Sequence, residues 1–414
     1  MDGLEWSVLE PLMDSGRAPN FKALVERGIG GEIKTMVPTF SPVLWTTMAT
    51  GVGPRQHGIL HFAELREDGS FGLPYTSNTR KVPAIWNIAG EQQRSVLSTG
   101  WWVSWPAEEV NNGRVIASYA AQAQGAILWK SGVWDEGLPD LTWPRGLIDE
   151  LYPALEAGSP EGALRGEFNQ LFGVIKRGGE WEFPWGRDRL FRVGYHGDRT
   201  HHRIMCEQLS KEVADLNLVY YGLADVAGHF FWRYREPGAF SYHIPKDQVE
   251  ILGDRIDRTY EVLDSWLGEL LQTVPADTMV MVVSDHGMHA ANTGDSRAIQ
   301  SGAHEDAPNG VFIAAGDGVK SRGLLPPGRR QLTHVLEIAP TLLDWLNLPL
   351  AADMPGKSAR RLMDEAWLRS HPEQQTASYA DGFRAATTPR VPRPGLNEEF
   401  LTNIKDIGYM DDED

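Results

Sequence analysis

The chain has 414 residues, of which 42% are hydrophobic and 23% charged, as in ordinary globular proteins, and its length suggests roughly two or three domains. The formal net charge of −17 argues against binding to a nucleic-acid polymer, because such binding requires clustered lysine and arginine side chains. No apolar run approaches the length of a membrane span, and no signal peptide is evident. The single cysteine, Cys206, fits a reducing compartment, so we expect a cytoplasmic location.

Strand and helix patterns alternate along the chain, which predicts a three-layer α/β/α sandwich around a mostly parallel central sheet. The helical patterns cover residues 5–28 with a break at Pro19, and residues 42–50, 83–92, 201–215, 246–274 and 333–347. The strand patterns cover residues 94–99, 115–118, 216–221, 278–283 and 310–316.

Residues 119–195 interrupt this alternation, since they are rich in Gly, Pro and Trp and show weak periodicity. We interpret them as an insertion or cap over the sheet. The remaining residues, 1–118 and 196–414, then form the core, and the acidic end of the chain is expected to fray.

Two of the predicted strands end just before an Asp and a His. Asp225 and His229 are four residues apart, so on a helical turn both lie on one face and can bind one ion. Asp285 and His286 are adjacent and can serve one site only from a loop, which Gly287 favours. Each pair also has an ordinary structural explanation, as a capping Asp with a core His or as a turn at a strand end.

His304 lies further along, in a loop rich in small residues. A single loop His is usually only solvated. Here it would supply a third protein ligand for an ion already held by Asp225 and His229, which is the typical arrangement of catalytic zinc with one open position.

Ser41 is the candidate nucleophile, at the start of a predicted helix whose first residue is Pro42. Its ordinary explanation is a helix N-cap. The same place favours an anion, because the N–H groups and the dipole at the amino end of a helix attract negative charge. Thr39, Thr46 and Thr47 are alternative hydroxyls, although the last two fall inside the helix.

Asp2 is a further candidate ligand, close to the beginning of the sequence. A metal-binding Asp normally follows a buried strand, so either such a strand lies upstream of this start or another strand takes its place. Seven residues together indicate a two-metal hydrolase of phosphate esters: Asp2, Ser41, Asp225, His229, Asp285, His286 and His304.

These motifs resemble the alkaline phosphatase superfamily, and more closely its type I phosphodiesterase/nucleotide pyrophosphatase branch. The resemblance rests on Asp2-Gly3 and on residues 41–51, 53–59, 225–229, 284–288, 302–304, 310–316, 338–343 and 407–409. A sulfatase is disfavoured, because that class has a Cys or Ser two residues before a Pro, whereas Pro42 directly follows Ser41.

The resemblance implies one ion bound by Asp225, His229 and His304, and a second bound by Asp2, Asp285, His286 and the nucleophile Ser41. Zn²⁺ is the usual metal of this branch, and Mn²⁺ or iron stays open because carboxylate and imidazole ligands accept several metals. The implied reaction is in-line displacement, in which Ser41 attacks phosphorus and water then releases it.

The expected substrate is a small-molecule phosphate ester, and a diester is favoured because no arginine stands out as a clamp for a phosphate monoester. Two alternatives stay open, a phosphomonoesterase of the same superfamily and a binding protein on an inactive hydrolase scaffold. The sequence leaves the oligomeric state open.

Overall fold

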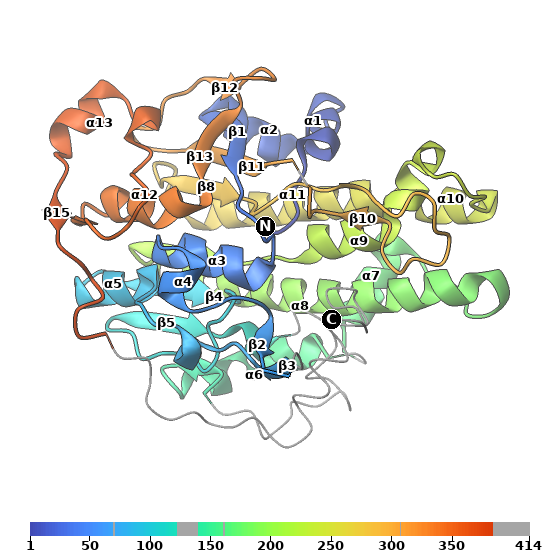
Figure 1. Cartoon of the computed structure of the whole chain (residues 1–414), viewed down its shortest axis with the longest axis horizontal. Coiled ribbons are helices and arrows are strands. Elements are labelled where there is room, and N and C mark those ends of the chain that lie inside the picture. Colours follow the sequence, from blue (N-terminus) through green and yellow to red (C-terminus); the bar gives the residue numbers. More distant parts are fainter. Residues whose placement is uncertain (69–70, 122–139, 160–161, 307, 384–414) are drawn as a thin grey trace.

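The computed structural model describes residues 1–68, 71–121, 140–159, 162–306 and 308–383 (Figure 1). The expected family motif at residues 407–409 and the acidic end of the chain lie outside this described part. Within it, no helix combines the length and the apolar character needed to cross a bilayer.

The strands form two main sheets. One has the order β12 (Gly323–Leu324), β1 (Ile29–Lys34), β11 (Gly310–Ala315) and β8 (Val280–Val283), and β13 (Gln331–His334) also pairs with β1. The other has the order β6 (Thr142–Trp143), β5 (Gly113–Ile116), β4 (Val96–Thr99) and β7 (Leu216–Val219). Three small ladders pair β2 (Ala63–Leu65) with β3 (Phe71–Pro74), β9 (His289–Ala290) with β10 (Gly302–Ala303), and β14 (Leu350–Ala351) with β15 (Gln375–Thr376).

Both main sheets are mixed, which corrects the expectation of a mostly parallel sheet. β4 is parallel to β5 and β7, but β1 is antiparallel to β11, and β11 is antiparallel to β8. The connection from β8 to β11 explains the difference. It contains no crossover helix, so β11 returns beside β8 in the opposite direction.

Thirteen α-helices surround the sheets in the described part of the chain (Figure 1). They are α1 (Trp6–Asp14), α2 (Pro19–Glu26), α3 (Ser41–Thr50), α4 (Pro54–His57), α5 (Ile85–Glu91), α6 (Leu147–Ala157), α7 (Leu164–Phe172), α8 (Glu182–Lys211), α9 (Leu223–Arg235), α10 (Lys246–Leu252), α11 (Arg255–Thr273), α12 (Ile338–Trp345) and α13 (Glu365–Ser370). The predicted break at Pro19 is confirmed, and the predicted long helix at 246–274 divides into α10 and α11.

The described part of residues 119–195 is more regular than its weak periodicity predicted, because it holds α6, α7 and the first half of α8. α8 passes without interruption through residue 195, where we had placed the boundary of the insertion. Aromatic packing holds this region on the core: Phe172 of α7 lies 4.9 Å from Phe191 of α8, which lies 5.3 Å from Phe231 of α9, measured between ring centroids. Its role as a cap stays a prediction.

Candidate metal centre

The six predicted ligand side chains converge in one buried cluster. They come from the amino-terminal loop, from α9 and from the loop that follows β8, and none is more than 3% exposed: Asp2, Asp225, His229, Asp285, His286 and His304. Side chains so polar are rarely buried unless they pair or bind a metal. The cluster therefore has the composition and the burial of a metal centre.

His286 lies in the middle of the cluster. Its Nε2 atom is 3.3 Å from Asp2 Oδ1 and 3.5 Å from Asp285 Oδ2, and its ring stacks on that of His304 with 3.8 Å between centroids. Two overlapping groups have their ligand atoms within 4.8 Å of one another, Asp2, Asp285 and His286 in one, and Asp225, His286 and His304 in the other. His286 thus belongs to both groups, which the sequence did not predict.

Asp225 and His229 lie on α9 as their spacing predicted. Asp225 Oδ1 is 3.3 Å from His229 Nε2 and 4.0 Å from His304 Nε2. The amino-terminal loop reaches this helix because Gly3 has a φ of +67° and no side chain, and a Cβ atom there would lie 2.6 Å from the Cα of Asp225.

Each of the three cluster histidines is held through its Nδ1 atom. The Nδ1 atom of His229 donates to the carbonyl oxygen of Gly302 at 2.9 Å, and that of His286 to the carbonyl oxygen of Gly287 at 3.0 Å. A carbonyl only accepts, so in the neutral imidazole, which is the form that binds a metal ion, both Nε2 atoms carry the lone pair. The Nδ1 atom of His304 lies 3.0 Å from the hydroxyl oxygen of Thr39.

Two aromatic side chains orient Asp2. Its Oδ2 atom accepts a hydrogen bond of 2.9 Å from Trp45 Nε1 and one of 2.6 Å from the Tyr220 hydroxyl. The other oxygen, Oδ1, is left facing His286. Trp45 and Tyr220 were not predicted from the sequence to contact the site, although Trp45 lies only four residues after the nucleophile candidate.

Ser41 is the first residue of α3 and not its N-cap, which is Phe40, so our assignment was one residue off. The helix predicted over residues 42–50 does end at Thr50, and Gly51 follows it with a φ of +70°. Ser41 is 1% exposed, and its hydroxyl makes no hydrogen bond among the described residues. Thr39 contacts His304 on one side of Ser41 and Trp45 contacts Asp2 on the other, so the start of α3 lies against the cluster.

The electrostatics follow from burying several charges together. Burial alone raises the pKa of Asp2, but the hydrogen bond and charge of His286 outweigh it and hold the pKa below its usual range. Burial and the Asp2 carboxylate raise the pKa of Asp285 well above its usual range. Burial lowers the pKa of His286, but Asp285 and Asp2 overcome it and raise that pKa to about 10. Burial and the neighbouring imidazoles lower the pKa of His304.

The cluster fits divalent metal ions. In their absence the positive charge that balances the carboxylates comes from the His286 imidazolium, and a metal cation would take over that role. Both carboxylate oxygens of Asp285 and the hydroxyl of Ser41 are buried without a hydrogen bond among the described residues, which is costly unless a ligand occupies the site. Mixed carboxylate and imidazole donors suit Zn²⁺, and they also accept Mn²⁺ or iron.

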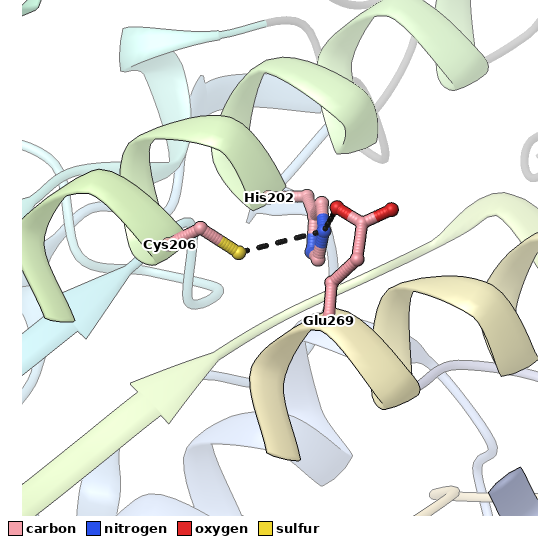
Figure 2. Close-up of side chains that lie close together, drawn as sticks. All are labelled: His202, Cys206 and Glu269. Carbon is pink, nitrogen blue, oxygen red and sulfur yellow. Dashed lines mark hydrogen bonds and ion pairs between the residues drawn. The ribbon is translucent and has the colours of Figure 1, made fainter. Parts of the chain in front are cut away.

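A second group of possible ligands, His202, Cys206 and Glu269, lies between α8 and α11 (Figure 2). Here the imidazole is already bonded at both nitrogens, with Nδ1 2.8 Å from the Tyr221 hydroxyl and Nε2 3.0 Å from Glu269. Burial raises the pKa of Cys206 to about 11, so the thiol stays neutral and is a poor metal ligand. We interpret this group as a contact between two helices.

The sequence pattern of the type I phosphodiesterase/nucleotide pyrophosphatase family matches residues 1–341. The chain belongs to this family. As a type I phosphodiesterase/nucleotide pyrophosphatase family member, it is a hydrolase that acts on phosphoester bonds.

Several solved structures align with this phosphodiesterase-family chain at low sequence identity. Murine ectonucleotide pyrophosphatase/phosphodiesterase 5 aligns with a TM-score of 0.50 and 12% sequence identity over 88% of this chain and 98% of its own. The human protein aligns with a TM-score of 0.49 and 13% identity over the same shares. Phosphonoacetate hydrolase from Sinorhizobium meliloti 1021 aligns with a TM-score of 0.40 and 13% identity over 80% of this chain and 82% of its own. No curated protein matches this family member in sequence.

Proposed function

We propose that this hydrolase cleaves small phosphate diesters, with Ser41 as its nucleophile and two divalent metal ions in the buried cluster. The observation that carries the proposal is the convergence of six ligand-type side chains beside the amino end of the helix that begins with Ser41. Asp2, Asp285 and His286 would hold the ion nearer to Ser41, and Asp225, His229 and His304 would hold the other. His286 lies between the two groups and can serve either.

The arrangement favours transfer of the phosphoryl group to Ser41. When bound, two divalent ions would ease deprotonation of a serine hydroxyl and stabilise the charge that develops on the phosphate oxygens. At the amino end of α3, Pro42 has no N–H group, and Val43 N and Leu44 N donate to the carbonyl oxygen of Phe40, so the attraction for a phosphate oxygen comes from the positive end of the helix dipole. Ser41 Oγ, having lost its proton to water, bonds to phosphorus while the bond from phosphorus to the leaving oxygen breaks. Water then cleaves the Ser41 phosphoester and restores the hydroxyl.

The buried arginines favour a diester over a monoester. A monoester carries an additional negative charge, which a free guanidinium typically neutralises. Each of the four buried arginines in the described part of the chain is engaged by protein groups: Arg80 by Glu108, Arg255 by Asp188, Arg330 by Glu10, and Arg233 by the carbonyl groups of Ser296 and Ala298.

Turnover of bis-p-nitrophenyl phosphate and of p-nitrophenyl phosphate, with added Zn²⁺ and with a chelator, tests this function. We expect metal-dependent turnover that favours the diester and falls by roughly three orders of magnitude or more in Ser41→Ala. Ser41→Thr retains a hydroxyl and should recover part of the rate. Mass spectrometry of quenched reactions should find phosphate on the Ser41 peptide.

Two other results would contradict the proposal. Faster turnover of the monoester than of the diester would show that the protein is a phosphomonoesterase. If the folded protein binds no metal and turns over neither substrate, it is a binding protein on an inactive hydrolase scaffold.

A further inference from the structure

Trp102 has a buried hydrogen-bond donor that no described group accepts. Its side chain is 5% exposed, and its Nε1 atom is buried without a hydrogen-bond partner in the described part of the chain. An indole N–H group can only donate, and a buried donor that is left unpaired costs free energy. Such a group requires an explanation, and an oxygen atom of a bound ligand is one.

Two buried tryptophans nearby have their donors paired. Trp45 Nε1 donates to Asp2 Oδ2 at 2.9 Å, and Trp101 Nε1 donates to the carbonyl oxygen of Trp45 at 3.1 Å. Both side chains are as deeply buried as that of Trp102 or deeper. Buried tryptophans usually find a partner for the N–H group in this way. Trp102 directly follows Trp101 in the chain, so its unpaired donor is a local exception within one aromatic cluster.

Trp102 follows the carboxyl end of β4, beside the strand that leads into α9. β4 ends at Thr99, which is in register with Val219 at the end of the parallel strand β7. Tyr220 N still donates to the carbonyl oxygen of Thr99 at 3.1 Å where the two chains leave the sheet. Ligands of open α/β sheets bind outside the carboxyl ends of the strands. Trp102 therefore leaves the sheet at the edge from which α9 and its proposed metal ligands also start.

One ring contact connects Trp102 with the acidic part of the cluster. The ring of Trp102 lies 6.2 Å from that of Tyr220, measured between centroids, with an angle of 72° between the ring planes. The hydroxyl of Tyr220 donates to Asp2 Oδ2 at 2.6 Å. A single aromatic side chain thus separates Trp102 from one of the proposed metal ligands.

A second series of ring contacts leads from Trp102 towards the proposed nucleophile. The ring of Trp102 lies 5.8 Å from that of Phe62, and the ring of Phe62 lies 5.9 Å from that of Phe40. Phe40 directly precedes Ser41, whose hydroxyl is also buried without a hydrogen bond among the described residues. Each end of this series therefore has a polar group that a bound ligand can satisfy.

We propose that Trp102 Nε1 donates a hydrogen bond to a non-bridging oxygen of the phosphoryl group that Ser41 attacks. The inference deepens the proposed function and rests on it. Trp102 would then be a catalytic residue that contacts the substrate, in addition to the residues that hold the metal ions. Its N–H group would find in the substrate the acceptor that the described part of the protein does not supply.

A neutral, fixed donor suits this role. The indole adds no charge, so it can contact the singly charged phosphoryl group of a diester without the guanidinium that a monoester typically requires. The rings of Phe62 and Tyr220 pack against Trp102, so the donor is held in place before the substrate binds. Donors fixed in advance stabilise the charge that develops on oxygen in the transition state.

Trp102→Phe tests the proposal, because phenylalanine retains an aromatic ring and lacks the N–H group. We expect kcat for bis-p-nitrophenyl phosphate to fall by roughly two orders of magnitude with little change in KM, as for the loss of one fixed donor to a developing charge. Trp345→Phe is the matched control and should leave kcat unchanged. Trp345 Nε1 is also buried without a partner in the described structure, but it lies at the end of α12.

Two further measurements separate donation to a ligand from a structural role. Metal affinity should be the same in Trp102→Phe and in the wild type. In isotope-labelled Ser41→Ala protein loaded with Zn²⁺, the indole proton resonance of Trp102 should move downfield as inorganic phosphate is added, because a new hydrogen bond deshields the proton. The resonance is assigned by its loss in the Trp102→Phe variant, and this measurement leaves the Trp102 side chain intact.

Three results would overturn the proposal. The first is a kcat for Trp102→Phe equal to that for Trp345→Phe. The second is a fall in kcat with an equal loss of metal affinity, which would show that Trp102 acts only through Tyr220 and Asp2. The third is a Trp102 indole resonance that phosphate does not move. Failure of the proposed function differs from all three, because the wild type would then turn over neither ester, and the indole resonance alone would decide the role of Trp102.

Discussion

Trp45 Nε1 donates a hydrogen bond of 2.9 Å to Asp2 Oδ2, and this bond ties the helix of the proposed nucleophile to the first acidic residue of the cluster. Trp45 is 1% exposed and packs edge-on against Trp101 and Tyr220, so its position is fixed by packing as well as by the hydrogen bond. A change at Trp45 therefore acts on Asp2 without touching a proposed ligand.

Trp45→Phe should weaken metal binding while it leaves the fold intact. The smaller ring retains aromatic packing but loses the hydrogen bond that orients Asp2, and loss of such an outer-shell partner typically costs roughly 10–100-fold in metal affinity. Metal titration with a competing chelator measures the change. Trp86→Phe is the matched control, since Trp86 is equally buried and donates at 2.8 Å to Glu108, outside the cluster. Equal effects of the two changes would refute the orienting role of Trp45.

Ser284→Ala should destabilise the protein by about 1–3 kcal/mol. The Ser284 hydroxyl is fully buried, accepts a 2.8 Å hydrogen bond from Leu4 N and donates at 2.8 Å to the carbonyl oxygen of His286. Urea unfolding measures the loss. Ser98→Ala is the control, because Ser98 is also fully buried and its hydroxyl makes no hydrogen bond within the described structure. A loss no larger than that of the control would show that this bridge is dispensable.

The chelated, metal-free protein should lose stability as the pH rises from about 7 to about 10. The carboxylates of Asp285 and Asp2 raise the folded-state pKa of His286 to about 10, against burial, from an unfolded value of 6.5. The imidazolium therefore stabilises the fold fully below pH 6.5, and its contribution disappears as the pH passes through the folded-state pKa. Thermal melts in chelator should show a steeper decline for the wild type than for His286→Gln. If the stability of the two proteins fell equally with rising pH, the His286 imidazolium would not be the cause of the loss.

Cys206→Ala should leave the metal content unchanged. Both nitrogens of His202 are bonded to protein groups, and the thiol is 3.6 Å from one of them as a weak partner only. Elemental analysis after dialysis against Zn²⁺ should find the wild-type stoichiometry in this variant and a reduced one in His286→Ala. Loss of one metal ion from Cys206→Ala would instead assign a third metal site between α8 and α11.

Local patterns predicted the parts of the centre that one element supplies. Asp225 and His229 share a face of α9 because their spacing matches a helical turn, and the loop at Asp285 and His286 follows from Gly287. These properties depend only on neighbours in sequence.

Contacts between distant segments could not be predicted from these local patterns. His286 is shared between two groups of ligand atoms because three separate segments pack against it, and no spacing in the sequence encodes that. The mixed sheet was missed for a related reason. An apolar strand pattern is the same whether the strand runs parallel or antiparallel to its neighbour. The direction of β11 relative to β8 is set by the path of the connection between them.

In the connection from β8 to β11, two of the proposed metal ligands lie at one end and the exposed residues lie at the other. It is closed at its base where Gly287 N donates to the carbonyl of Pro308, and again higher up where Ala291 N donates to the carbonyl of Ser301. Asp285 and His286 lie at the base, whereas residues 292–300 project beyond the second closure and are mostly exposed. The carbonyl groups of Ser296 and Ala298 in this tip accept hydrogen bonds from the buried Arg233 of α9. Insertions at the exposed positions that leave these two carbonyl groups in place should keep the base unchanged, so the outer surface of the enzyme can vary here while the proposed metal centre stays in place.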